Sequence, residues 1–122
     1  MRVLLVEDSP TQAAFYKEVL QEVGLPVIHA RDGREALDMA FEYQPDLIIL
    51  DVHLPVLDGI QVCARLSRLP ETAHIPVIML TRLDQPEDAM AGLNAGALDY
   101  IAKDEFAVET LLASMEQLGI TN

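Results

Sequence analysis

The chain has 122 residues, of which about half are apolar, and its 20 acidic against 8 basic side chains give a formal net charge of −12 at pH 7. This length suits one domain with its own core, so we expect residues 1–122 to form one domain, whose acidity argues against direct binding of nucleic acid. No signal peptide or membrane-spanning apolar run is visible, and Cys63 is the single cysteine, so we expect a soluble cytoplasmic protein without membrane contact or disulfides.

The apolar pattern alternates between short continuous runs, typical of buried strands, and stripes typical of amphipathic helices. In chain order it predicts a strand at 3–6, a helix at 10–23, a strand at 26–30, a helix at 33–44, a strand at 46–50, a helix at 58–69, a strand at 75–80, a helix at 84–95, a strand at 98–102 and a final helix at 108–118. Predicted N-caps include Ser9, Asp58 and Asp84. The stripes place Val23, Phe41 and Leu118 on inward helix faces.

Strands that alternate with amphipathic helices predict a parallel sheet covered on both faces, with right-handed crossovers. We therefore expect an α/β fold, a single three-layer doubly wound (βα)5 domain with a five-stranded parallel sheet. In open sheets of this kind, ligands bind beyond the carboxyl ends of the strands, where the strand order reverses.

Polar residues capable of chemistry follow four of the five predicted strands. They are Glu7 and Asp8 after the first, Asp51 after the third, Thr81 after the fourth and Lys103 after the fifth. If these strands are neighbours, three carboxylates, one hydroxyl and one ammonium meet at one edge of the sheet. Clustered carboxylates repel each other unless a cation is present, and such a set can hold a divalent cation and a phosphoryl group.

These positions give the chain a resemblance to the receiver domains of two-component response regulators, over essentially its full length. The matching pieces, in order, are Glu7-Asp8, Asp51, Pro55, Asp58-Gly59, Thr81, Ala95-Gly96-Ala97, Tyr100 and Lys103. Each piece alone is common in proteins, but all of them in this order strongly indicate a receiver domain. The resemblance implies the flavodoxin-like strand order 2-1-3-4-5 and a phosphorelay signalling domain that catalyses only its own phosphorylation and dephosphorylation.

The resemblance further implies that Asp51 accepts a phosphoryl group from a phosphohistidine on a partner histidine kinase or phosphotransfer protein. It implies Mg²⁺ bound by Asp8, Asp51 and the backbone carbonyl of His53, with Glu7 acting through water. A hard cation suits this role, because an aspartate oxygen must approach a dianionic phosphoryl group.

Three residues are implied to respond to the phosphoryl group. Thr81 donates its hydroxyl to one phosphoryl oxygen, and Lys103 pairs with another as a compact point charge. Phosphorylation then draws Thr81 inward and lets Tyr100 change rotamer. The face made by the last two helices and the last strand, within residues 84–118, is expected to move and to bind a downstream effector or a second copy of the chain.

The chain departs from the family pattern at three points. Arg82 stands where the residue after the threonine is usually small, and Asp104 stands where proline in a cis peptide usually follows the lysine. His53 and Leu83 flank the acceptor at positions that commonly tune dephosphorylation. We expect a trans Lys103–Asp104 bond, since a non-proline cis bond costs about 2.5–4 kcal/mol. We also expect Asp104 to be the N-cap of the last helix, and Arg82 to shield the phosphoryl group from water.

Three alternatives stay open from the sequence alone. A flavodoxin-like cofactor domain shares the architecture, although no Gly-rich phosphate loop follows the first strand. A phosphatase with an aspartyl-phosphate intermediate usually carries a second acid two residues after its nucleophile, where this chain has His53. A degenerate receiver binds partners without phosphorylation but is expected to lack a site ligand. His29, His53 and His74 show no metal-ligand spacing, and we interpret them as incidental.

Overall fold

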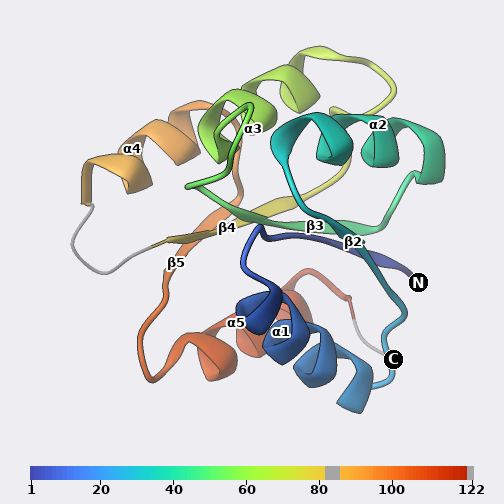
Figure 1. The fold of residues 1–122 in the computed structure, drawn as a ribbon, viewed down its shortest axis with the longest axis vertical. Coiled ribbons are helices and arrows are strands. Elements are labelled where there is room, and N and C mark those ends of the chain that lie inside the picture. The colour runs from blue at the N-terminus through green and yellow to red at the C-terminus, as the bar shows by residue number, and fades with distance from the viewer. Residues whose placement is uncertain (82–85, 121–122) are drawn as a thin grey trace.

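The computed structural model describes residues 1–81 and 86–120, and in this part of the chain five strands form one parallel sheet in the order β2-β1-β3-β4-β5. The strands are β1 (Val3–Val6), β2 (Val27–Ala30), β3 (Leu47–Asp51), β4 (Val77–Thr81) and β5 (Asp99–Ala102). The helices are α1 (Pro10–Glu22), α2 (Gly33–Tyr43), α3 (Gly59–Arg68), α4 (Pro86–Asn94) and α5 (Ala107–Gln117). Helices α2, α3 and α4 cover one face of the sheet, and α1 and α5 cover the other (Figure 1). The predicted three-layer fold and its strand order are confirmed.

The core consists of two apolar layers, one on each face of the sheet, because successive strand residues point to opposite faces. In β1, Leu5 belongs to the layer under α1 and α5, and Leu4 belongs to the layer under α2 and α3. All residues of β1, β3 and β4 are buried, which explains their continuous apolar runs. Burial of one such Leu or Ile side chain stabilises the fold by about 1.5–3 kcal/mol. Cys63 packs in the layer under α2 and α3.

Two predicted helix caps are confirmed. Ser9 Oγ accepts a hydrogen bond from Gln12 N at 3.3 Å, and Asp58 Oδ1 accepts one from Gln61 N at 2.9 Å. These bonds satisfy amides that have no partner within the first helical turn. The predicted cap Asp84 lies outside the described residues, as do Arg82 and Leu83. No described helix is both long enough and apolar enough to cross a bilayer.

Three residues that were predicted to face inward are exposed instead. Phe41 is 55% exposed. It follows Ala40 by one residue, and that step turns its side chain by about 100° away from the buried stripe of Ala36 and Ala40. Val23 and Leu118 are the C-cap residues of α1 and α5, so the helical periodicity no longer fixes their direction.

The predicted N-cap of the last helix is wrong. Helix α5 begins at Ala107, and the residue before it, Phe106, makes no side-chain capping bond. Asp104 Oδ1 instead accepts a hydrogen bond from Phe106 N at 2.8 Å, so Asp104 stabilises the turn that precedes the helix. The Lys103–Asp104 peptide bond is trans, as predicted.

Candidate functional site

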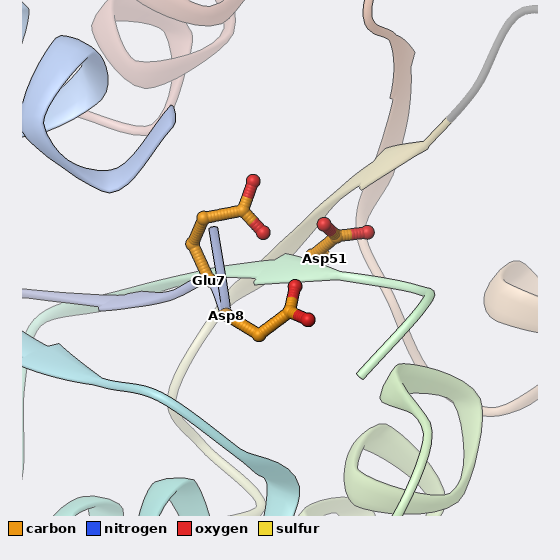
Figure 2. A group of neighbouring side chains, drawn as sticks. All are labelled: Glu7, Asp8 and Asp51. Carbon is orange, nitrogen blue, oxygen red and sulfur yellow. The ribbon is translucent and has the colours of Figure 1, made fainter. Parts of the chain in front are cut away.

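Three acidic side chains meet at the carboxyl ends of the strands, as predicted. One carboxylate oxygen from each of Glu7, Asp8 and Asp51 lies within 4.8 Å of the other two. Figure 2 shows these side chains gathered where β1 and β3 end. Glu7 and Asp51 are buried, whereas Asp8 is exposed. Three oxygen donors at these separations suit a hard divalent cation such as Mg²⁺.

The register of the sheet explains why residues so far apart in sequence converge. The residue before Glu7 pairs with the residue before Asp51 in the β1–β3 ladder. In the β4–β5 ladder, Thr81 pairs with the residue before Lys103. Because all the strands are parallel, the four residues leave the sheet on the same edge.

Lys103 joins the two buried acids. Its Nζ donates hydrogen bonds to Glu7 Oε1 at 2.8 Å and to Asp51 Oδ2 at 2.8 Å. A third bond reaches Gln12 Oε1 at 2.5 Å, so all three ammonium hydrogens have an acceptor. The Lys103 backbone amide donates to Thr81 O at 2.6 Å, which ties the loop after β5 to the end of β4.

Burial and mutual interaction set the protonation of this cluster. Burial, together with the neighbouring Asp51 carboxyl, raises the pKa of Glu7 to about 7, although Lys103 opposes the rise. Burial alone would raise the pKa of Asp51, but its interactions with Glu7 and Lys103 outweigh burial and lower it. Burial would lower the pKa of Lys103, but Asp51 and Glu7 raise it. Asp51 is therefore the ionised acid of the pair and Lys103 stays cationic.

Two buried polar atoms at the site have no hydrogen-bond partner among the described residues, namely Thr81 Oγ1 and Glu7 Oε2. Buried polar atoms are normally paired, so both atoms point to a group that the site takes up. Thr81 is fully buried at the end of β4. Tyr100 is half-buried on the adjacent strand β5.

The loop after β3 is held close to Asp51 by Gly59. A Cβ added to Gly59 would lie 2.2 Å from Asp51 O, so only glycine allows α3 to start against the acceptor strand. Within the loop, Val56 has a φ of 71°, and Leu57 N donates to Pro55 O at 2.8 Å. This γ-turn is strained for a β-branched residue. The close approach of Gly59 to Asp51 O accounts for the glycine in the Asp58-Gly59 piece of the family pattern.

Two histidines make specific contacts here. His53 N donates to Asp51 Oδ1 at 3.0 Å, and the His53 ring Nε2 lies 3.3 Å from Asp88 Oδ2 in α4. His29 Nε2 lies 2.7 Å from Glu7 O. The sequence did not predict these contacts of the two histidines.

Gln12 and Asp88 are site neighbours that sequence reasoning missed. Gln12 is 91 residues from Lys103, and nothing in its own surroundings marks it beyond a place in the first turn of the helix after the acidic pair. The residues at this sheet edge surround a cavity of about 230 Å³. Its lining comprises Glu7, Asp8, Ser9, Gln12, Asp51, His53 and Lys103.

Comparison with known proteins places these features in a family. Residues 3–116 match the response regulator receiver domain. The DNA-binding dual master transcriptional regulator RpaA of Synechocystis sp. is 43% identical over 117 residues, which are 96% of this chain and 48% of that protein. The chain spans at most about half the length of the first curated relatives it matches.

Two solved structures extend the comparison. The signal receiver domain of a signal transduction histidine kinase from Syntrophus aciditrophicus is 42% identical, with a TM-score of 0.87 over 96% of this chain and 88% of that one. The receiver domain of a sensor histidine kinase from Pseudomonas aeruginosa, solved with a magnesium ion coordinated in its active site cleft, is 30% identical. Its TM-score is 0.86 over 97% of both chains.

Proposed function

This chain belongs to the family of response regulator receiver domains, and on that premise we propose that Asp51 receives a phosphoryl group from a phosphohistidine on a partner histidine kinase or phosphotransfer protein. The observation that carries the proposal is the setting of Asp51. Its buried carboxylate accepts hydrogen bonds from Lys103 Nζ and His53 N and lines the 230 Å³ cavity. The family favours this reading over the flavin-domain and phosphatase alternatives, and the complete set of acids favours it over a degenerate receiver.

The proposed transfer forms one bond and breaks one. A carboxylate oxygen of Asp51 bonds to phosphorus, the P–N bond of the phosphohistidine breaks, and the donor imidazole keeps the electron pair and takes up a proton. Lys103 and Thr81 lie at the same sheet edge as Asp51, and in the proposal their ammonium and hydroxyl donate to phosphoryl oxygens. Such charge-assisted contacts offset the charge that accumulates on the transferred group.

We assign the Mg²⁺ ligands to Asp8, Asp51 and the backbone carbonyl of His53, with Glu7 acting through water. The fit rests on three carboxylate oxygens within 4.8 Å of one another and on the unpartnered Glu7 Oε2. A bound Mg²⁺ supplies charge neutralisation between the attacking carboxylate and the phosphoryl oxygens. The magnesium in the Pseudomonas aeruginosa receiver domain supports the assignment by similarity.

The proposed output route runs through Thr81 and Tyr100 to the face formed by α4, β5 and α5. The Thr81 hydroxyl has no hydrogen-bond partner among residues 1–81 and 86–120 and can turn toward a phosphoryl oxygen, and Tyr100 lies on the next strand. Exposed apolar side chains on or beside this face, Met90, Leu93 and Leu98, suit a protein partner. We propose that this face binds a downstream effector or a second copy of the chain.

The proposal extends to the whole chain. Residues 1–122 form one receiver domain that works in the cytoplasm and catalyses only its own phosphorylation and dephosphorylation. The match over residues 3–116 supports this extent. The further activities of the longer curated relatives are not part of the proposal.

Incubation with Mg²⁺ and a small phosphodonor, followed by rapid quenching and intact mass measurement, tests the proposal. We expect one phosphoryl adduct on the wild type, none on Asp51→Asn, and none on the wild type in a chelator. Asp38→Asn removes an exposed carboxylate of α2 and is the matched control, which should be labelled as the wild type is. An adduct that persists in Asp51→Asn would overturn the assignment.

A further inference from the structure

His53 connects the phosphoacceptor site to helix α4. It follows β3 by two residues and lines the same cavity as Asp51. Its ring Nε2 lies 3.3 Å from Oδ2 of Asp88, a residue in the first turn of α4. One residue therefore borders both the space for the phosphoryl group and the start of α4.

Asp88 depends on this contact. Its side chain is only 17% exposed, and its Oδ2 atom is buried without a hydrogen-bond partner among the described residues. A buried carboxylate oxygen that has lost water without gaining a partner is destabilised. An acid is favoured in the first turn of a helix, and the His53 imidazole, 3.3 Å away without forming a hydrogen bond, is the polar group of the described chain that contacts Oδ2.

The backbone of His53 is tied to the acceptor. His53 N donates a hydrogen bond to Asp51 Oδ1 at 3.0 Å. The backbone that carries the His53 ring is therefore fixed to the acceptor side chain. A phosphoryl group on Asp51 brings added negative charge and three strong acceptor oxygens into the cavity. Those oxygens and the Asp88 carboxylate then compete for one imidazole.

We propose that Asp88 is a positioning residue that holds the His53 ring on the α4 side of the cavity, and that a phosphoryl group on Asp51 draws the ring away from Asp88 and frees the first turn of α4. The release step rests on the proposed phosphorylation of Asp51, whereas the resting contact does not. Because a single partly exposed polar contact is modest, the expected effect of removing it is about two- to fivefold.

The resting contact is tested without phosphate by hydrogen exchange of the amides at 90–92, which bond to the carbonyls of the first turn of α4. Asp88→Asn should speed this exchange about two- to fivefold over the wild type. The matched control is Glu87→Gln, which removes the same charge from the same helical turn at an exposed position. Glu87→Gln should exchange as the wild type does, and equal acceleration in both variants would show that helix charge, not His53, holds the turn.

The release step is tested with Mg²⁺ and beryllofluoride, a mimic of the phosphoryl group. Asp88→Asn should bind the mimic about two- to fivefold more tightly than the wild type, because the contact no longer has to be broken. In a His53→Ala background the same Asp88 substitution should change the affinity by less than about 1.5-fold, because the two residues act as one unit. An undiminished effect of Asp88→Asn in that background overturns the proposal. A wild type that binds no mimic overturns the proposed function and the release step, while the exchange measurement still decides the resting contact.

Discussion

Lys103 determines the charge balance of the site. One ammonium faces two buried acids, and its third hydrogen bond goes to the neutral amide of Gln12. The exposed Asp8 adds a further acid at the same place, so the cluster is negative overall even when Glu7 is protonated. A divalent cation held by the acids would offset that excess, so removing an acid that bonds the cation directly should weaken metal binding most.

Asp8→Asn should weaken Mg²⁺ binding by about tenfold or more, whereas Glu7→Gln should weaken it clearly less. The reason is that Asp8 is assigned a direct bond to the ion and Glu7 a bond through water. Isothermal titration calorimetry of both variants and the wild type measures the difference. Equal losses would mean that the assignment of direct and indirect ligands is wrong.

Cys63 should resist alkylation in the folded protein. Burial raises the pKa of its thiol, although a hydrogen bond with Ser67 acts in the opposite direction, and the thiolate is the reactive form. A pKa raised by folding means that the stability from this group is complete below the thiol's unfolded pKa and is lost as the pH rises through the folded value. Iodoacetamide labelling at pH 8 should therefore be slow without denaturant and fast in concentrated urea; fast labelling of the native state would contradict the burial.

The loop between β3 and α3 directly follows the proposed phosphoacceptor, Asp51, and has two unusual backbone positions. It contains a residue in the left-handed region, Val56, and a glycine that touches the acceptor backbone, Gly59. Val56 is also 75% exposed, so its side chain contributes little packing that would offset the strain. The two positions should therefore respond to substitution in opposite directions.

Val56→Gly should leave the protein as stable as the wild type or stabilise it by up to about 1 kcal/mol. Relief of left-handed strain, about 1–2 kcal/mol, exceeds the about 0.5–1 kcal/mol that glycine's backbone entropy costs. Gly59→Ala should destabilise by about 2 kcal/mol or more, because its Cβ would overlap Asp51 O. Urea unfolding of the three proteins decides this, and a Val56→Gly variant less stable than the wild type by 1 kcal/mol or more would contradict the strain argument.

At the scale of the whole molecule, the alternation of apolar runs and stripes was enough to predict the layers and the edge where the site lies. The period of strands and helices is a local property, and parallel pairing then fixes which strand ends share an edge. Contacts made by long side chains across that edge are not local. Gln12 reaches Lys103, and His53 reaches Asp88, only once the helices have packed. Helix ends were predicted less well for the same reason, since Phe106 rather than Asp104 precedes α5.

Binding of beryllofluoride with Mg²⁺ should shift the backbone amide signals of Tyr100 and of α4 more than those of α2, which lies away from the proposed output face. The contacts that Thr81 and Lys103 would gain are few, so a bias of about 1–3 kcal/mol between the two conformations is expected. Two-dimensional NMR titration follows the shifts. Signals at Tyr100 and α4 that stay fixed while the mimic binds would refute this output route.

The central claim is that Asp51 is the phosphoacceptor, and the position of the phosphoryl group tests it most directly. Borohydride reduces an aspartyl phosphate to homoserine, which marks the acceptor permanently for peptide mapping by mass spectrometry. After incubation with Mg²⁺ and a phosphodonor, we expect homoserine at position 51 and at no other aspartate. Homoserine at Asp8 or Asp58, or an unmodified Asp51 in protein that carries the adduct, would contradict the account.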